Sequence, residues 1–376
     1  MPRLTRRSLI VGGSAAAIAF ALRESAIADA KSVYRESIVI DGLGGLGNSM
    51  AEPGTPLAEA YFHDVRNSGL TCVHVTITPV GTTAPDTAFT ETVLGIGDEE
   101  REIDGHADVL TRVRTVADIT AAKANSRTGI IYGLQDAVAF ETDLERLDEL
   151  YRLGIRVAQP TYNRRNLLGD GCLEAANAGL SKAGFEAVER MNELGILVDL
   201  SHCGRQTAAD AIRHSKRPVA FTHTGSAAQN DHPRNRTDEE LRAVAAKGGV
   251  SGIYFMPFLS DGKQPTAADI IRHLEHMIEV AGEDHVSIGT DGSVSAEVVN
   301  QEFKDIFAGF VRRRKEAGIA APGESEEGYL FANELNTPRR LETLADMLSA
   351  RGHGDARIEK ILGKNLVRVF SETWKT

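Results

Sequence analysis

Eight short apolar runs, separated by stretches with helical periodicity, constrain the fold of this sequence more than any other feature. The runs are nearly continuously apolar, which is typical of parallel strands that are buried on both faces. They end at Asp41, Thr78, Gly133, Thr161, Ser201, His223, Phe255 and Thr290. Eight strand–helix repeats are the number that a (β/α)8 barrel of the TIM type requires, so we predict this α/β fold. An open, doubly wound sheet is the alternative, because periodicity does not show whether a sheet closes.

Helix start and stop signals lie between the apolar runs. We predict helices over residues 143–154, 181–195, 237–248 and 266–282, and a final helix over residues 355–370. Ser181 and Thr237 stand where N-caps are expected, and glycines close these segments. Two regions interrupt the alternation. Residues 81–108 are rich in Thr and Gly and predict a long loop, and residues 300–338 predict a loop insertion on the barrel.

The N-terminal segment has the order of a twin-arginine export signal. The pair Arg6 and Arg7 precedes an apolar run over residues 9–22, and small residues suited to cleavage follow. This run is shorter than the roughly 20 residues that a membrane-spanning helix needs, and a stable N-terminal anchor is the alternative. We therefore predict a signal at residues 1–30, a periplasmic or secreted protein, and a single barrel domain over residues 31–376.

The charge balance argues against nucleic acid as a partner. The net charge is -11 over 376 residues, whereas nucleic acid and anionic membrane surfaces select clustered Lys and Arg. The three cysteines, Cys72, Cys172 and Cys203, fit no zinc module by their spacing, and we interpret them as structural thiols. We expect a small-molecule substrate, no nucleic acid and no stable transmembrane anchor.

Polar residues at the ends of the predicted strands are the candidates for chemistry, because the active sites of barrels lie at the carboxyl ends of their strands. These candidates are Asp41, Gln135, Tyr162, His202, His223 and Asp291. His202 and His223 follow consecutive strands, in "VDLSHC" and "FTHTG", and two imidazoles that converge on one mouth suit a metal such as zinc. For either histidine alone, a hydrogen-bonded structural role is the alternative.

Two further side chains complete the candidate site. Asp291 follows the last strand and predicts a metal ligand or a general base, with an N-cap role as the alternative. Arg234, in the loop after the His223 strand, predicts a two-pronged contact with a substrate carboxylate. Arg236 competes for this role. A surface ion pair with Asp238 or Glu239 is the alternative for Arg234.

The stretch "IVIDGLGGLGN" at residues 38–48 matches the dinucleotide-binding pattern G-x-G-x-x-G. That pattern requires a helix directly after its glycines, but Asn, Ser and prolines follow here and indicate a loop. The acidic residue about twenty positions on, Asp64, lies within a predicted helix rather than at a strand end, where ribose recognition requires it. We therefore interpret the stretch as the first strand and its turn, not as a nucleotide site.

Several longer stretches resemble the renal, or membrane, dipeptidase family. They are "GILVDLSHCGRQTAADAIRHSKRPVAFTHTG", "HPRNRTDEELRAVAAKGGVSGIYF", "EVAGEDHVSIGTD" and the closing "GKNLVRVF". The resemblance covers most of the chain from about Ile130 on and is specific in the order and context of both histidine motifs. It implies a metallo-dependent hydrolase-like (β/α)8 barrel with two zinc ions that cleaves dipeptides and related amides. It also implies the homodimer that many family members form.

The resemblance assigns roles where the residues match. His202 and His223 match the two histidines that hold the second zinc. Arg234 matches the arginine that binds the substrate carboxylate. Asp291 matches the active-site aspartate near the attacking water and the substrate amine.

The sequence departs from the family pattern at the first metal site. The family's His-x-Asp pair falls at Leu43 and Gly45, and its bridging glutamate falls at Gln135. A neutral amide is a poor bridge between two cations, so we expect one zinc ion rather than two, with another divalent metal or none as alternatives. Asp291, Gln135 or water would complete the metal shell, and Asp136 is a substitute ligand if the register shifts by one. The family's oxyanion-binding histidine falls at Tyr162, which still donates a hydrogen bond.

These observations predict an exported metal-dependent hydrolase that cleaves a dipeptide or a related small amide carrying a carboxylate. In this scheme Asp291 handles the proton, Arg234 anchors the carboxylate, Tyr162 stabilises the oxyanion, and Tyr162 and Gln135 also contact the substrate. One alternative is an enzyme of the same fold with one metal or none and with lyase, isomerase or non-peptide hydrolase chemistry. The other is a non-catalytic periplasmic binding protein.

Overall fold

The computed structural model describes residues 33–47, 50, 55–77, 80–81, 84–261, 263–326 and 328–375. The expected export signal at residues 1–30 lies outside this part of the chain. Within it, no helix is both long enough and apolar enough to cross a membrane. Cys72, Cys172 and Cys203 are free thiols, and no disulfide joins them.

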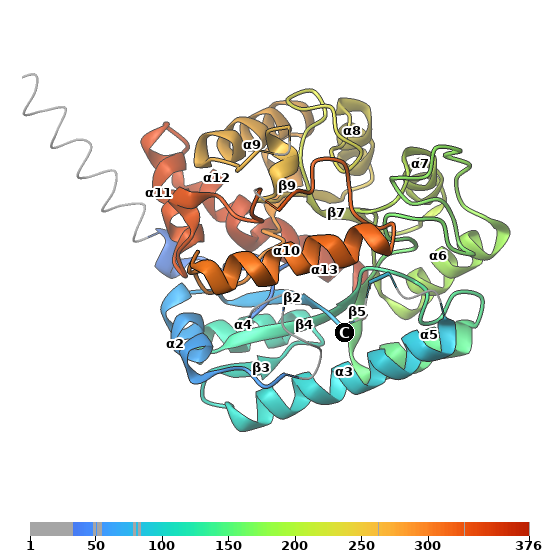
Figure 1. Ribbon diagram of the computed structural model, residues 1–376, viewed down its shortest axis with the longest axis horizontal. Helices are drawn as coiled ribbons and strands as arrows, with labels where there is room; N and C mark the ends of the chain where they lie inside the picture. Colours follow the sequence, from blue (N-terminus) through green and yellow to red (C-terminus); the bar gives the residue numbers. More distant parts are fainter. Residues whose placement is uncertain are drawn as a thin grey trace, which may run out of the picture.

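One parallel sheet organises the molecule (Figure 1). Its strands are β1 (Ile40–Asp41), β2 (Cys72–Thr76), β3 (Leu110–Arg112), β4 (Thr128–Leu134), β5 (Ile155–Ala158), β6 (Leu197–Asp199), β7 (Val219–Thr224), β8 (Val250–Ile253) and β9 (Val286–Ile288). Eight of them follow the order β1-β2-β4-β5-β6-β7-β8-β9 and coincide with the eight predicted runs. The short β3 pairs with the start of β4, ahead of the residues where β5 begins to pair. The predicted (β/α)8 barrel is confirmed.

The glycine-rich turn after β1 closes the barrel. The Gly42 amide donates to the Ile288 carbonyl at 2.8 Å, and the Asp291 amide donates to the Leu43 carbonyl at 2.8 Å. A Cβ on Gly42 would lie 2.8 Å from the same Ile288 oxygen, so only glycine permits this approach of β1 to β9. The turn that resembled a nucleotide-binding loop is therefore the seam between the first and last strands.

Helices surround the sheet and connect its strands. They are α2 (Glu59–Ser68), α3 (Pro85–Gly105), α4 (Val116–Ala124), α5 (Leu144–Leu153), α6 (Lys182–Leu194), α7 (Arg205–His214), α8 (Asp238–Ala246), α9 (Ala267–Ala281), α10 (Gln301–Glu316), α11 (Arg340–Ala350), α12 (Asp355–Glu359) and α13 (Asn365–Thr373). The predicted caps are confirmed, because the Ser181 hydroxyl accepts from the Gly184 amide and Thr237 forms a capping box with Glu240. Leu366 and Phe370 of α13 pack in one cluster with Val157 and Val250 of the strands.

The prediction of a loop over residues 81–108 is wrong, because α3 occupies most of it. Ala88, Thr92, Ile96 and Ile103 are its buried residues, and their spacing of about one helical turn buries one face of α3. Thr and Gly between these positions concealed the period. The expected insertion at residues 300–338 contains α10, whose Phe303, Phe307 and Val311 are buried at the same spacing. In Figure 1, α10 crosses the front of the molecule in orange.

Candidate active site at the carboxyl ends of the strands

His202 and His223 meet above β6 and β7, as their positions predicted. His202 follows β6 and is 3 % exposed, and His223 lies near the end of β7 and is fully buried. Their Nε2 atoms are 3.0 Å apart. The Gln135 side-chain nitrogen, which follows β4, lies 3.2 Å from the same His223 atom. Three of the predicted site residues therefore converge on one point.

Hydrogen bonds behind the two rings set their protonation. The Asn163 amide nitrogen donates to the Ile319 carbonyl at 2.7 Å, so its oxygen, 2.6 Å from His202 Nδ1, must accept from that ring. The Thr222 hydroxyl donates to Asp199 Oδ2 at 2.6 Å, and its oxygen therefore accepts from His223 Nδ1 at 2.8 Å. Both rings carry their hydrogen on Nδ1, and both Nε2 lone pairs point into the site.

This arrangement suits one metal ion. Burial holds the pKa of both histidines well below its ordinary value, and the charge of Arg234 lowers both further. Neutral imidazole is the form that ligates metal. Two nitrogens on a tetrahedral zinc are about 3.3 Å apart, close to the 3.0 Å observed.

The two imidazoles have no third ligand of the usual kinds beside them, because no three His, Cys, Asp or Glu side chains of the described residues are grouped closely enough to hold a metal. Asp136, the possible substitute ligand, accepts a hydrogen bond from Asn166 at 2.9 Å instead. Gln135, whose side-chain nitrogen lies 3.2 Å from His223 Nε2, could add an oxygen to the two imidazoles after rotation of its amide.

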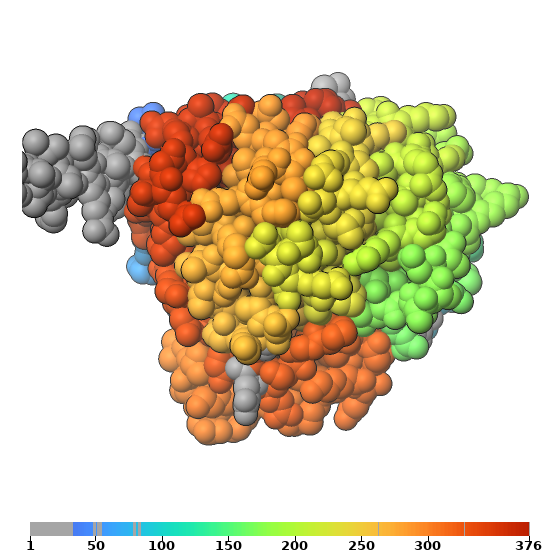
Figure 2. All heavy atoms as spheres, turned by 90° about the horizontal axis from the view of Figure 1, so that it is seen from above, coloured from blue at the N-terminus to red at the C-terminus, as the bar shows by residue number. Residues whose placement is uncertain are grey.

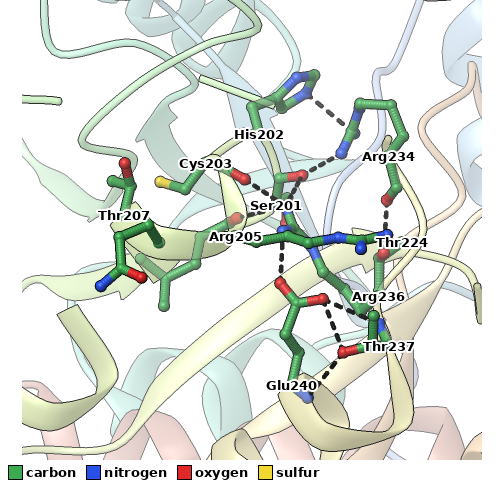
Figure 3. A network of polar contacts seen from close by, with 12 residues as sticks. Ser201, His202, Cys203, Arg205, Thr207, Thr224, Arg234, Arg236, Thr237 and Glu240 are labelled. Atoms are coloured by element: carbon green, nitrogen blue, oxygen red, sulfur yellow. Dashed lines mark hydrogen bonds and ion pairs between the residues drawn. The ribbon is translucent and has the colours of Figure 1, made fainter. Parts of the chain in front are cut away.

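Arg234 is a buried cation at the same point. Its guanidinium donates to the Ser201 carbonyl and lies 3.1 Å from His202 Nε2, as Figure 3 shows. It also lies 5.7 Å from the centre of the Tyr254 ring. The ion pairs of the described residues include one for Arg236 but none for Arg234. A buried guanidinium without a carboxylate partner favours an anionic ligand.

Arg236, the competing candidate, faces away from the histidines. It pairs with Glu240 at 3.1 Å and donates to the carbonyls of Leu200, Ser201 and Cys203. Figure 3 shows it beside Glu240 and Thr237, at the start of α8. Its task is to hold the loop that carries His202, so Arg234 is the better candidate for substrate contact. The alternative of a surface ion pair for Arg234 is wrong, because Arg234 is 1 % exposed.

Tyr162 covers one face of His202. The ring centroids are 4.0 Å apart and the planes are inclined by 27°. The Tyr162 hydroxyl accepts a hydrogen bond from Arg314 Nη1 at 3.1 Å. Burial raises the pKa of this hydroxyl above its ordinary value, although Arg314 opposes the rise. Tyr162 therefore keeps its proton and is available as a donor.

Asp291 lies beside the seam in a left-handed conformation, with φ of 58°. Asp291 caps no helix, because the next helix along the chain is α10, which begins at Gln301. Burial raises its pKa to about 6, while Arg234 and Arg314 pull in the opposite direction. It lines a small cavity of about 30 Å³ whose walls include Phe303 and Phe307. A carboxyl group with this pKa exchanges protons near neutral pH.

Several residues at the site carry no local sequence signal. Asn163, Thr222 and Asp199 orient the histidines, and Arg314 reaches Tyr162 from α10. His74, in the middle of β2, is buried with its Nε2 unpaired. From the sequence, His74 could point either into the barrel or toward the helices, because strand alternation does not distinguish the two faces.

Asp41, which was on the list of strand-end candidates, is structural. Its carboxylate accepts from the Thr290 amide at 2.8 Å and from the Thr290 hydroxyl at 2.6 Å. It also accepts from the Leu43 amide at 3.3 Å. Burial raises its pKa to about 7. Asp41 therefore ties β1 to the end of β9.

Comparisons with known proteins give one consistent result. The model of the family described as "Membrane dipeptidase (Peptidase family M19)" matches residues 27–321. Dipeptidase verJ of Clonostachys rogersoniana is 28% identical over 270 residues, which are 71% of this chain and 61% of that protein. The chain thus spans about three fifths of the length of that relative.

Solved structures are similar over nearly the whole chain. An amidohydrolase from Pseudomonas aeruginosa is 32% identical, with a TM-score of 0.78 over 92% of this chain and 99% of its own. A metallopeptidase from Rhodobacter sphaeroides, liganded with a phosphinate mimic of the dipeptide L-Ala-D-Ala, is 20% identical, with a TM-score of 0.71 over 90% of this chain and 100% of its own. At that identity the second likeness supports the fold alone.

Proposed function

Because the chain belongs to the membrane dipeptidase family, peptidase family M19, we propose that it is a metal-dependent dipeptidase that cleaves a dipeptide or a related small amide with a free carboxylate. The observation that carries this proposal is the convergence of two neutral imidazoles whose Nε2 atoms lie 3.0 Å apart. The buried, carboxylate-free Arg234 beside them supports an anionic substrate.

His202 and His223 would hold the metal, and Gln135 or water would complete its shell. When bound, zinc or another divalent ion supplies an acidic water or polarises the amide carbonyl. The chain's own residues bind and orient the substrate. Arg234 pairs with the substrate carboxylate, and Tyr162 donates to the carbonyl oxygen as negative charge develops on it.

Asp291 moves the proton. Because its pKa is raised to about 6, its carboxyl group can both accept and release a proton near neutral pH. It takes a proton from the attacking water and returns it to the leaving amine. In its ionised form it also attracts the free amine of a dipeptide, which favours substrates that carry both termini.

We propose that the site takes one ion. Leu43, Gly45 and Gln135 stand where the resemblance implies a His, an Asp and a bridging Glu. Metal analysis of purified protein should find about one divalent ion per chain, and two tightly bound ions would contradict this.

Restoring the three positions provides a matched test of the metal count. A Cβ on Gly45 would meet nothing closer than 3.9 Å, so this position accepts a side chain. The combined variant Leu43→His, Gly45→Asp and Gln135→Glu should raise the metal content to about two ions per chain. If the content stays at one, these positions do not determine the count.

The activity test is a panel of dipeptides, L-Ala-D-Ala among them, assayed with zinc, manganese or iron. We expect turnover that His202→Ala abolishes and that chelator removes. His276→Ala is the matched control, because His276 pairs with Asp238 at 2.8 Å away from the site. Turnover of a non-amide substrate that survives chelator would favour altered chemistry in the same fold. Tight binding without turnover would favour a binding protein.

We also propose that the protein is exported, since Arg6 and Arg7 precede an apolar run and small residues. The full chain should appear in the periplasmic fraction of a bacterial host. Replacing both arginines by lysine should retain it in the cytoplasm. A periplasmic level unchanged by this replacement would overturn the twin-arginine assignment.

A further inference from the structure

Arg314 enters the candidate site from outside the barrel. It lies in the last turn of α10, and its side chain is 13 % exposed. Its Nη1 donates to the Tyr162 hydroxyl at 3.1 Å, and its guanidinium lies 5.9 Å from the centre of that ring. Both contacts reach Tyr162, one of the strand-end residues, from a helix that follows the last barrel strand.

The segment that follows α10 is fixed against the mouth of the barrel. Ile319 accepts from Asn163 at 2.7 Å, and the Pro322 carbonyl lies 2.8 Å from His232 Nε2. Figure 2 shows the orange atoms of this part of the chain as a ledge that projects from the lower edge of the view. Arg314 is therefore presented to the site by a fixed wall.

Glu324 holds Arg314 in one orientation. Its two carboxylate oxygens accept from Arg314 Nε at 2.7 Å and from Nη2 at 2.9 Å, a forked pair in which Glu324 is buried and Arg314 is largely shielded. The Ala321 amide also donates to Glu324 at 2.8 Å. The fork leaves Nη1 as the guanidinium nitrogen that points to Tyr162.

The direction of the Tyr162 hydrogen bond determines what that hydroxyl can do. A guanidinium has donors and no acceptor, so the Tyr162 oxygen must accept from Arg314. The phenolic hydrogen is then left for another partner, and the described residues supply no acceptor for it. A nearby cation also makes a hydroxyl a stronger donor to developing negative charge.

We propose that Arg314 and Glu324 are positioning residues that commit the Tyr162 hydroxyl to donate to the substrate oxygen that becomes negative during amide hydrolysis. This inference rests on the proposed dipeptidase function. The segment that contains α10 thus positions the Tyr162 hydroxyl, and the positive charge of Arg314 strengthens that hydroxyl as a hydrogen-bond donor.

A double-mutant cycle on the full metal-loaded chain tests the proposal. Tyr162→Phe should lower kcat by about 100-fold, the order expected for loss of one oxyanion donor. Arg314→Gln should lower kcat by about 10-fold with little change in KM, and Arg314→Lys should recover part of the loss. In the Tyr162→Phe background, Arg314→Gln should have no further effect. A structural role alone would lower activity equally in both backgrounds.

A binding measurement provides a second readout. The affinity for a phosphinate mimic of L-Ala-D-Ala should fall in Arg314→Gln by about the same factor as kcat, because the mimic resembles the tetrahedral state. Arg312→Gln is the matched control, since Arg312 lies on the same helix, is 58 % exposed and should change neither value. Losses of Tyr162→Phe and Arg314→Gln that multiply in the double variant would overturn the inference. A wild-type protein that cleaves no dipeptide would instead overturn the proposed function.

Discussion

At the scale of single residues, the pKa of Asp291 leads to a prediction about pH. A proton acceptor must be ionised, and burial raises the pKa of Asp291 to about 6. We therefore expect kcat/KM to rise from pH 5 to pH 7 with a midpoint near 6. Asp291→Asn should lower the rate by about 10²- to 10⁴-fold. The measurement is a pH–rate profile with a buffer-matched dipeptide assay.

Asp136 provides the control for that profile. Its pKa is also raised by burial to about 6, but its carboxylate is engaged with Asn166. Asp136→Asn should keep the midpoint near 6. A flat profile in wild-type protein, or loss of the midpoint in Asp136→Asn, would show that Asp291 is not the group that titrates.

Strand-end position predicted four residues that meet in the structure, namely His202, His223, Gln135 and Tyr162. Arg234, which was predicted from the loop after β7 and from the family resemblance, reaches the same point. Asp41, another strand-end candidate, ties β1 to β9 instead, and the chemical roles of the site residues, Asp291 included, stay predictions. Asn163, Thr222 and Arg314 were missed, because their contacts depend on side-chain directions and on segments distant in the sequence. The sequence alone did not separate Arg236 from Arg234, because the pair of Arg236 with Glu240 depends on where α8 lies.

At the scale of elements, the packing of β2 against β4 is tight enough to test. A Cβ on Gly133 of β4 would lie 1.8 Å from Nε2 of the buried His74 of β2. Gly133→Ala should therefore lower the free energy of unfolding by about 1–3 kcal/mol, the usual cost of overpacking. The double variant Gly133→Ala with His74→Ala should recover part of this loss. Urea denaturation measures both.

Gly97 provides a matched control within a helix. It lies inside α3, and a Cβ there would meet nothing within 4 Å. Gly97→Ala should raise stability by about 0.5–1 kcal/mol through helix propensity. If Gly133→Ala were as stable as Gly97→Ala, His74 would not occupy the position described.

Element prediction succeeded where the apolar period was undisturbed. All eight barrel strands and the helices α5, α6, α8 and α9 were predicted, with ends shifted by a few residues. The helix α3 was missed because its buried face is narrow and partly built from Ala88 and Thr92, which are weak signals of burial. Tertiary packing, not local propensity, completes that helix.

At the scale of the whole molecule, metal binding should stabilise the fold. An ion that binds only the folded state at 100 times its Kd adds about 2.7 kcal/mol to the free energy of unfolding. The melting temperature should therefore rise by several degrees with zinc in wild-type protein and in Arg312→Gln. It should not rise in His202→Ala. An equal rise in His202→Ala would locate the ion elsewhere.

The barrel as a whole could be predicted from the count of strands, but its closure could not. Closure depends on backbone contacts between Gly42 and Ile288, which are separated by most of the chain. The glycines that make this approach possible gave a misleading motif in the sequence. These glycines are needed because the first and last strands of the barrel lie side by side at this point.

The contact between Asn163 and Ile319 links the outer wall of the site to the chemistry of a ring. An amide side chain presents oxygen on one side and nitrogen on the other, and the Ile319 carbonyl determines which faces His202. If that carbonyl moves away, the amide is free to turn over and offer a hydrogen where it had accepted one. The imidazole would then shift its own hydrogen to Nε2 and lose its lone pair toward the metal. Movement of the segment that carries Ile319 would therefore remove His202 as a metal ligand, and its return would restore that ligand.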